Sequence, residues 1–386
     1  MYSISDYGAM IADTARTQAF LRALGKAITP DSIVVDIGTG TGIFALLACR
    51  LGARRVYAIE PDDAIQVAKA MTIANGYRDR IEFIQDLSTK VNLPERADVV
   101  VSDIGGVLPW FRNHILSIVD ARRRFLAPGG VLIPSRDTAW LAVVEAEEWY
   151  AQQTVPLKNN GVDIDMEAAW HIVSNTFNRA KVKSQHLMTE ARPWATIDYA
   201  DVESPDARGS VEWTVGKSGI GHGLLMGFHR VLSPGVSISN APGTARKINA
   251  DRTYSTILLP WSTPVPLAAG DRVIVHLEAV LTGDDYIWNW KTSVFDRGGR
   301  EVVKAEFAQS TFFGVPLSAS RLRKRGASYT PTLNEEGRIA RFVLDSMSQC
   351  VPIGEIARRL SSEFTGRFQD PMDTLSYVAD LAQKYG

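Results

Sequence analysis

Short apolar runs alternate with longer amphipathic segments over residues 1–137. Five runs rich in Val and Ile predict strands, namely SIVVDI, RVYAIE, RIEFIQ, ADVVVSD and GVLIPS. The segments between them, such as AIQVAKAMTIANG and NHILSIVDARRRFLAPGG, carry apolar residues at helical spacing. Apolar strands joined by helical crossovers are typical of a parallel sheet covered on both faces, so we expect a doubly wound α/β domain. Gly76 and the Pro128–Gly130 segment are expected to end the helices before them.

The pattern changes over residues 138–325. Short runs with alternating polarity, such as RVIVHLEAVL, YIWNWKTSVF and GLLMGFHRVL, are separated by Gly, Pro, Asp and Asn. This pattern predicts an all-β domain, which we expect to be a β-barrel, with a sandwich as the alternative. Trp288 and Trp290 alternate along one run and therefore face the same side, where filling of the core is favoured over lining an acceptor pocket.

A third pattern begins after the basic segment LSASRLRKRGASYTPTLNEE, which has no periodicity and predicts a domain boundary. Within residues 326–386, the segments RIARFVLDSM, PIGEIARRL and TLSYVADLAQ repeat apolar residues three and four positions apart. We therefore expect a small helical domain at this end of the chain.

Composition removes several classes of function. Lys and Arg number 42 against 43 Asp and Glu, so no overall field attracts the chain to nucleic acid or to an anionic membrane. The chain has no run of about 18 apolar residues and no secretory signal, which predicts a cytoplasmic protein. Cys49 and Cys350 lie in unrelated segments, and no histidines are paired at helical spacing, so we expect reduced thiols and no metal site.

The stretch VVDIGTGTGIFALL carries the first candidate chemistry. Gly38, Gly40 and Gly42 follow the first predicted strand at every second position, and Asp36 precedes them by two residues. A dinucleotide fingerprint would need its third glycine at position 43, where the chain has Ile43. A bare turn at the end of this strand can receive a ligand, but Asp36 would repel a pyrophosphate. The pattern favours a ligand that carries an amino group and a sulfonium.

Acids also follow the second and third predicted strands. A carboxylate at Glu60 can accept hydrogen bonds from both ribose hydroxyls, and one at Asp86 can meet an adenine amino group. Thr39, Pro61 and Leu87 flank these positions and belong to the predicted cofactor site. The three acids and the glycine loop resemble class I methyltransferases, which implies S-adenosylmethionine (SAM) as cofactor. The alternative is a set of ordinary strand-end acids in another doubly wound protein.

Four longer segments narrow the resemblance. MIADTARTQAFLRAL, GARRVYAIEPDD, ADVVVSDIGG and FLAPGGVLIPSRDT are similar to protein arginine methyltransferases. The resemblance implies that Arg16 holds the carboxylate of the cofactor, that Tyr7 lies near the ligand, and that a β-barrel follows the cofactor domain. That family dimerises through an arm inserted in the barrel, for which NNGVDIDMEAAWHIV is the candidate segment in a possible homodimer.

The catalytic positions depart from that family. Two glutamates on the loop after its fourth strand clamp the substrate guanidinium, and here they fall on Asp103 and Arg112. Its Thr-His-Trp motif falls on residues 252–254, which lack the histidine. A guanidinium facing Arg112 is repelled, so we do not expect arginine methylation. Arg112 in the acceptor pocket would favour a carboxylate, with Asp103 orienting the acceptor or the cofactor amine. The alternative places Arg112 on an exposed helix.

Residues 326–386 are similar to PqqD-like elements, which bind the leader of a ribosomally made peptide as an extra strand. A structural or dimerising tail and a nucleic-acid-binding tail are the alternatives. The resulting hypothesis is a methyltransferase that acts on a ribosomally synthesised and post-translationally modified (RiPP) precursor peptide, by O-methylation of a carboxylate. Its rivals are a divergent protein N-methyltransferase and a non-catalytic scaffold that binds SAM and peptide.

Overall fold

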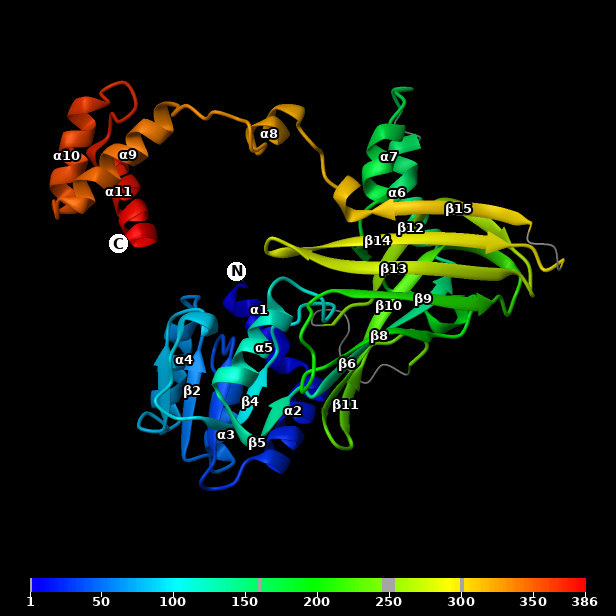
Figure 1. Cartoon of the computed structure of the whole chain (residues 1–386), viewed down its shortest axis with the longest axis horizontal. Helices are drawn as coiled ribbons and strands as arrows, with labels where there is room; N and C mark the ends of the chain where they lie inside the picture. The colour runs from blue at the N-terminus through cyan, green and yellow to red at the C-terminus, as the bar shows by residue number, and fades with distance from the viewer. Residues whose placement is uncertain (1, 159–160, 245–253, 299–301) are drawn as a thin grey trace. The chain divides into compact units, whose positions relative to one another are not determined.

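The computed structural model describes residues 2–158, 161–244, 254–298 and 302–386. The chain divides into two compact units, Met1–Pro316 and Leu317–Gly386, whereas the sequence pattern placed the division at residue 325. The first unit holds an α/β domain followed by an antiparallel β domain, and the second is helical (Figure 1).

The α/β domain is built on one parallel sheet in the order β3-β2-β1-β4-β5. Its strands are β1 (Ile33–Ile37), β2 (Arg55–Ile59), β3 (Ile81–Ile84), β4 (Ala97–Ser102) and β5 (Leu126–Ile133). The five predicted strands are thus confirmed. The strand order reverses between β1 and β4, and in open parallel sheets the crevice at the carboxyl ends of two such strands receives the ligand.

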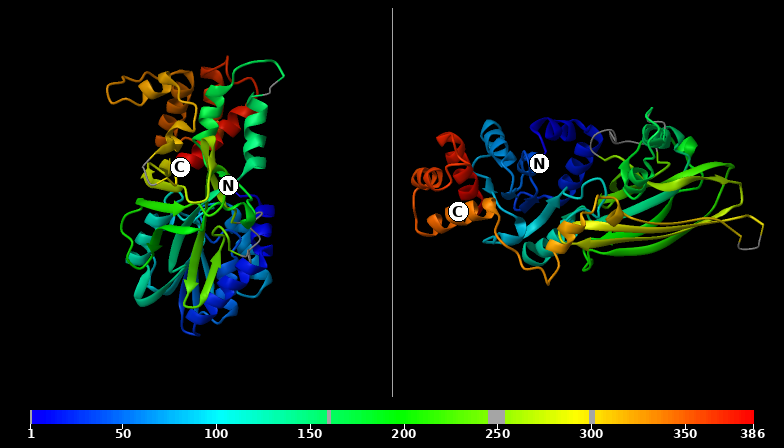
Figure 2. Two further views of the ribbon diagram at one scale, coloured as in Figure 1. Left: turned by 90° about the vertical axis from the view of Figure 1, so that its right-hand side faces the viewer. Right: turned by 90° about the horizontal axis from the view of Figure 1, so that it is seen from above.

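Helices cover both faces of this sheet, as the doubly wound prediction requires (Figures 1 and 2). Val34 of β1 packs with the helices on one face, and its neighbour Val35 packs on the other face with residues of α5. Because both faces are covered, every residue of β1 is buried. The helices are α1 (Ile4–Ala12), α2 (Thr14–Ala27), α3 (Ile43–Arg50), α4 (Ala64–Ala74) and α5 (His114–Arg124).

One predicted boundary is wrong and another is confirmed. The Pro128–Gly130 segment does not end a helix, because α5 already ends at Arg124 and the segment lies inside β5. Since β5 is an edge strand that pairs with β4 alone, it tolerates a proline that cannot donate a hydrogen bond. Gly76 does follow α4, with φ of +75°.

The β domain consists of two antiparallel sheets rather than one closed ring of strands (Figure 1). One sheet has the order β7-β12-β10-β6-β8, with β11 paired to β10, and the other has the order β15-β14-β13-β9. Residues of both sheets share one apolar core. The strands are β6 (Arg136–Val144), β7 (Asn178–Arg179), β8 (Arg192–Asp198), β9 (Ala207–Thr214), β10 (Gly219–Ser233), β11 (Val236–Ser239), β12 (Ile257–Leu267), β13 (Arg272–Thr282), β14 (Asp285–Phe295) and β15 (Val303–Ser310).

Trp288 and Trp290 lie in this core with 1% of their surface exposed, which confirms the core interpretation.

A helical insertion, α6 (Glu147–Lys158) and α7 (Glu167–Ser174), follows β6. The candidate dimerisation segment covers residues 159–173. Its first two residues lie outside the described ranges, and the remainder includes α7 up to Val173.

The second unit contains the predicted helices packed around a small core of their own (Figure 2). Ile339, Ile356, Leu360 and Val378 are buried in that core. All of residues 317–386 are described, and none of them lies in a strand. A leader peptide therefore has no strand in this unit to pair with, which removes the binding mode expected from the PqqD-like likeness. The helices are α8 (Ala319–Lys324), α9 (Glu335–Ser348), α10 (Ile353–Glu363) and α11 (Pro371–Tyr385).

Candidate functional site

The glycine loop joins β1 to α3 in a conformation that only glycine adopts readily. Gly38, Gly40 and Gly42 have φ values of +72°, +53° and +85°. A Cβ on Gly38 would lie 2.2 Å from Cγ2 of Ile104, and one on Gly40 would lie 2.4 Å from Cε1 of Tyr7. The loop is therefore covered closely by helix α1 and by the segment that follows β4.

Asp36, at the end of β1, is fully buried beside this loop. Its Oδ2 accepts hydrogen bonds from Thr39 Oγ1 at 2.6 Å and from the Ala45 backbone N–H at 3.0 Å. Its Oδ1 has no hydrogen-bond partner among the described residues. Burial raises the pKa of Asp36 to about 7, although the two hydrogen bonds partly offset this effect. A buried carboxylate oxygen without a partner suits a ligand that brings a positive charge.

Glu60, which follows β2, contacts the same glycine loop. Its Oε2 accepts a hydrogen bond from the Gly40 N–H at 2.9 Å, and its Oε1 accepts one from the Asp62 N–H at 3.0 Å. Burial raises the pKa of Glu60, and the two backbone bonds act against that rise. Each carboxylate oxygen has a second lone pair, so Glu60 can still accept from the two hydroxyls of a ribose. Pro61 is exposed beside it.

Asp86 and Leu87 follow β3 at the same edge of the sheet, because β3 runs parallel to β2. Asp86 is half-buried, and its Oδ1 accepts from the Leu87 N–H at 2.7 Å. Leu87 is 49% exposed. Their place beside an adenine ring stays a prediction.

Asp103, which follows β4, lies between two arginines. Its Oδ2 accepts from Arg16 Nε at 2.8 Å and Nη2 at 2.6 Å, and also from the Tyr254 hydroxyl. Its Oδ1 accepts from Arg230 Nη1 at 2.6 Å. Burial alone would raise the pKa of Asp103, but the two guanidiniums outweigh it and hold that pKa below its ordinary value. Asp103 is therefore an ionised structural partner and is poorly suited to act as a base.

Arg230 extends this network into the β domain. Its Nε and Nη2 donate to the two oxygens of Asp137 at 2.8 and 2.9 Å. Asp137 also accepts from the Tyr199 hydroxyl at 2.6 Å, and His114 Nε2 lies 2.8 Å from the same hydroxyl. Because the Tyr199 proton points to Asp137, we assign the His114 proton to Nε2. We call Arg16, Asp103, Arg230 and Asp137 the charged cluster.

Sequence reasoning identified two members of the charged cluster and missed the other two. Arg230 and Asp137 were not singled out, although each interrupts an apolar β segment. A charge inside such a segment is a signal in itself, because buried charges are almost always paired. Tyr254 is described and buried, whereas Arg252 and Thr253 of the same candidate motif lie outside the described residues.

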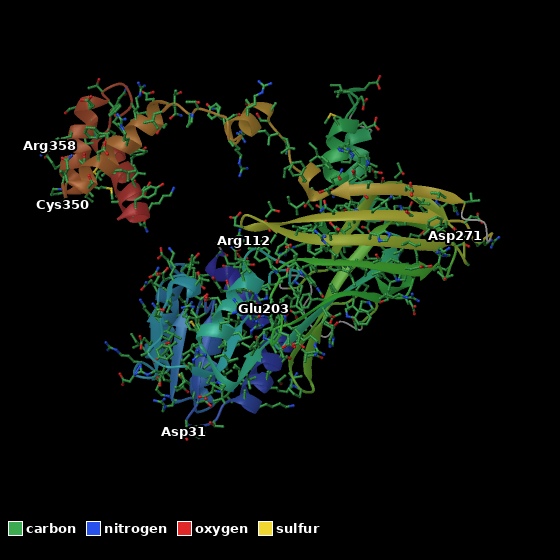
Figure 3. All side chains as sticks on the ribbon, in the orientation of Figure 1. Asp31, Arg112, Glu203, Asp271, Cys350 and Arg358 are labelled. Carbon is green, nitrogen blue, oxygen red and sulfur yellow. The ribbon has the colours of Figure 1, made fainter. Side chains whose placement is uncertain are left out.

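Arg112 lies apart from the charged cluster. It is exposed, with its guanidinium 5.4 Å from the centre of the Phe111 ring, and it has a φ of +44° (Figure 3). The preceding Trp110 is buried against Trp194, with 5.0 Å between ring centres, and anchors this segment to the β domain. The structure therefore does not bring Arg112 together with Asp103.

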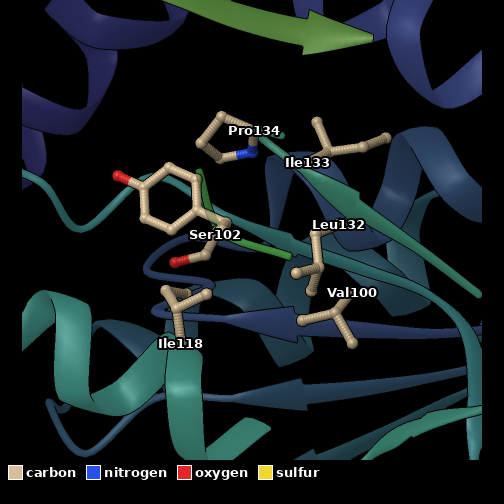
Figure 4. Close-up of a pocket in the computed structure, with 7 residues that line it drawn as sticks. Val100, Ser102, Ile118, Leu132, Ile133 and Pro134 are labelled. Carbon is tan, nitrogen blue, oxygen red and sulfur yellow. The ribbon is translucent and has the colours of Figure 1, made fainter. Parts of the chain in front are cut away.

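Other possible sites find little support. The space lined by Val100, Ser102, Ile118 and Leu132 is too narrow to admit water, so it is a packing gap rather than a ligand pocket (Figure 4). In the described part of the chain, His, Cys, Asp and Glu side chains form no group of three that suits a metal ion. None of the described helices is both long and apolar enough to cross a membrane.

Comparisons with known proteins relate the chain to methyltransferases. Residues 13–155 match the family model of ribosomal protein L11 methyltransferase (PrmA). The probable protein arginine N-methyltransferase 6 of Arabidopsis thaliana is 31% identical over 178 residues, which cover 45% of this chain and 41% of that protein. Protein arginine N-methyltransferase 2 of mouse is 28% identical over 285 residues, which cover 69% of this chain and 62% of that protein. The chain thus spans less than two thirds of either relative.

Two solved structures share the fold. Protein arginine methyltransferase 10 of Arabidopsis thaliana, in an open conformation, aligns with a TM-score of 0.67 and 20% identity, over 78% of this chain and 95% of that one. The Trypanosoma brucei PRMT1 enzyme–prozyme heterotetrameric complex with AdoHcy aligns with a TM-score of 0.70 and 19% identity. The alignment covers 80% of this chain and 98% of that one. The α/β domain is therefore a SAM-dependent methyltransferase domain related to PrmA and the protein arginine methyltransferases, and the β domain completes a fold like theirs.

Proposed function

We propose that this chain transfers the methyl group of SAM to a side chain of a protein or peptide. The observation that carries the proposal is the unpaired, buried Oδ1 of Asp36 beside a glycine loop that Glu60 also contacts. When bound, SAM supplies a methyl group on a positively charged sulfur. Asp36 would balance positive charge on the cofactor, Glu60 would hold the ribose, and Arg16 would pair with the cofactor carboxylate.

Helix α1 has a second role in this proposal. Tyr7 lies directly over Gly40, and α1 contributes no buried residue to the core. A helix held so lightly can move away to admit the cofactor and return to exclude water. Exclusion of water strengthens the electrostatic contacts that hold the reactants in line.

For the acceptor, we propose a carboxylate, so that the product is a methyl ester. An ionised carboxylate needs no base, and Asp103 is held by two arginines and is unavailable as one. The main task of the site is then to align oxygen, methyl and sulfur, and such orientation contributes up to about 7–11 kcal/mol. Exposed Arg112 would attract an acidic substrate toward the site.

A second candidate is N-methylation of the arginine type, which the likeness to protein arginine N-methyltransferases favours. The two candidates differ in the chemistry of their products. Protein and peptide acceptors would be incubated with radiolabelled SAM and then treated with mild alkali. Volatile radiolabelled methanol indicates a methyl ester, whereas label that stays on the acceptor indicates N-methylation. Binding of SAM without any labelled product would support the scaffold alternative.

We further propose a RiPP precursor as the acceptor, with its leader held by the second unit. The absence of a strand from residues 317–386 means that such binding would use helix surfaces. Holding a leader there would raise the local concentration of the modifiable end to about millimolar for a short tether. Removal of residues 317–386 should then raise the KM for a leader-containing peptide but leave that for the leaderless peptide unchanged. Equal KM values before and after removal would exclude this role.

We also propose that two copies of the chain associate through the insertion of α6 and α7. Exposed apolar residues gather on and near it, including Val155, Val162, Ile164 and Met166. Sedimentation of the full chain would show a dimer, and a monomer at all concentrations would contradict this proposal.

A further inference from the structure

We propose that residues 317–334, which we call the basic segment, bind an acidic segment of a partner protein or peptide. This interaction surface goes beyond the proposed methyl transfer and does not depend on it. Four cations stand within five positions of the basic segment, and no acidic residue occurs between Glu306 and Glu335. The cations are Arg321, Arg323, Lys324 and Arg325. Because cationic and acidic residues are almost balanced over the whole chain, this excess of positive charge is local.

Every residue of the basic segment is exposed. Its one helix, α8, buries none of its side chains and is capped by Ser318, whose hydroxyl accepts a hydrogen bond from the Arg321 N–H. None of the four cations has an ion pair or a side-chain hydrogen bond with a described residue. By contrast, Arg359 in α10 of the same unit pairs with Glu355. The basic segment therefore presents four positive charges to solvent that no described residue neutralises.

The chemistry of these side chains suits a partner rich in carboxylates. Like charges placed so closely repel one another, and a partner that brings negative charge relieves that repulsion. Three of the four cations are guanidiniums, each of which can bind a carboxylate through two parallel hydrogen bonds. Leu322 stands among the cations and Tyr329 and Leu333 follow them, and all three side chains are exposed. We therefore expect the partner to carry apolar residues among its acids.

The charge of the rest of the second unit favours a short acidic stretch of peptide over nucleic acid. Residues 335–386 contain six cationic and eight acidic residues, so the helices that follow the basic segment carry a small negative charge. A nucleic acid has a charged phosphate at every nucleotide and would extend beyond the basic segment, where those acids repel it. A short acidic stretch can end where the cations end.

The experiment measures the binding of labelled probes to the full chain by fluorescence anisotropy. The main probe is a short peptide with four glutamates and two leucines, and the reference peptide has glutamine in place of each glutamate. A short RNA oligonucleotide and phosphatidylserine vesicles, the latter followed by sedimentation, represent the other anionic partners. The wild-type chain should bind the Glu peptide at least about tenfold more tightly than the Gln peptide, and added salt should weaken that preference.

Two variants separate the local charge from the overall charge. The test variant combines Arg321→Gln, Arg323→Gln, Lys324→Gln and Arg325→Gln, and it should keep the fold because the basic segment buries no side chain. The matched control loses four exposed cations that are paired with acids in the first unit, by Arg54→Gln, Arg55→Gln, Arg136→Gln and Arg192→Gln. The test variant should bind the Glu peptide at least about tenfold more weakly than the wild type, whereas the control should stay within about threefold.

Equal losses in the two variants would overturn the role of the basic segment. Failure of the wild-type chain to prefer the Glu peptide over the Gln peptide would overturn it as well. Tighter binding of the RNA or of the vesicles than of the Glu peptide would contradict an acidic peptide as the partner. Because the readout is binding, absence of methyl transfer would refute the proposed function while this preference could still be measured.

Discussion

The Nη1 atom of Arg230 lies 2.6 Å from Oδ1 of Asp103, and this bond joins β10 of the β domain to the end of β4 in the α/β domain. The two residues are 127 positions apart in the chain. Arg16, from α2, holds the other oxygen of the same carboxylate. The charged cluster is therefore formed where three separate parts of the first unit meet.

Loss of the shared carboxylate should destabilise the first unit. Asp103→Asn keeps the shape of the side chain but leaves Arg16 and Arg230 with a neutral partner in a buried site. We expect the free energy of unfolding in urea to fall by about 3–5 kcal/mol. Asp198→Asn, which removes the exposed partner of Arg136, should cost at most about 1 kcal/mol. Equal losses in the two variants would contradict the structural role of Asp103.

Asp36 should make stability depend on pH in a particular direction. Its folded-state pKa of about 7 lies above its ordinary value of 3.8, so the folded protein keeps a proton that the unfolded chain releases between these values. The free energy of unfolding of the ligand-free protein therefore falls as pH rises through this window. Asp36→Asn should remove the cost of burying a charged carboxylate. The variant should therefore be more stable than the wild type above pH 7 by up to about 4 kcal/mol, as measured by denaturant unfolding.

The same substitution should weaken cofactor binding, because an amide cannot balance a positive charge. Higher stability together with weaker cofactor binding in this variant would show that Asp36 serves function at the expense of the free energy of unfolding. If Asp36→Asn bound SAM as tightly as the wild type at pH 8, Asp36 would have no electrostatic role in binding.

His114 should make the folded protein less stable as pH falls, which is the opposite of the effect of Asp36. Burial, followed by the charge of Arg230, lowers its pKa from 6.5 to about 4. The unfolded chain therefore binds a proton between these values that the folded protein does not, and stability falls as pH drops from 6.5 toward 4. In the His114→Gln variant, this acid-dependent loss should be smaller by up to about 3 kcal/mol. Unfolding free energies of the two proteins at pH 7 and pH 4.5 would show whether their difference changes with pH.

Two glycines offer a matched test of the covered loop. Gly40 and Gly76 both have positive φ, but a Cβ on Gly40 would meet Tyr7 while one on Gly76 would meet nothing within 4 Å. Gly76→Ala should cost only the backbone strain, about 1–2 kcal/mol, and leave cofactor binding intact. Gly40→Ala should displace Tyr7 and weaken cofactor binding, as measured by calorimetry. Equal cofactor affinity in the two variants would show that the Tyr7 contact is unimportant.

The sequence predicted the α/β domain well because its signals are local. Each strand of the parallel sheet is a short apolar run, and Asp36 and Glu60 stand at the carboxyl ends of two such runs. The helices of the second unit were also visible from apolar spacing. The Pro128–Gly130 segment was wrongly predicted to end a helix, because its composition is typical of a turn. An edge strand tolerates the same composition, and whether a strand lies at the edge depends on the order of strands in the sheet.

The charged cluster was only half visible for a different reason. Arg230 pairs with Asp137 across 93 residues and with Asp103 across 127, and no local spacing encodes such partners. The orientation of Arg112 was equally hidden, because it depends on how Trp110 packs against the β domain. Leader binding as an added strand was implied by the family likeness alone, whereas the residues themselves predicted helices, and helices are what the second unit contains.

The proposed cofactor site at Asp36 and Glu60 underlies every methyl-transfer function proposed for this chain. The most direct measurement is calorimetric titration of S-adenosylhomocysteine into the full chain, with Glu60→Gln in parallel. We predict binding at one site per chain, weakened by about tenfold or more in the variant that loses the charged acceptor. No heat from the wild-type chain, together with clear binding of a nicotinamide dinucleotide, would contradict this assignment of the site.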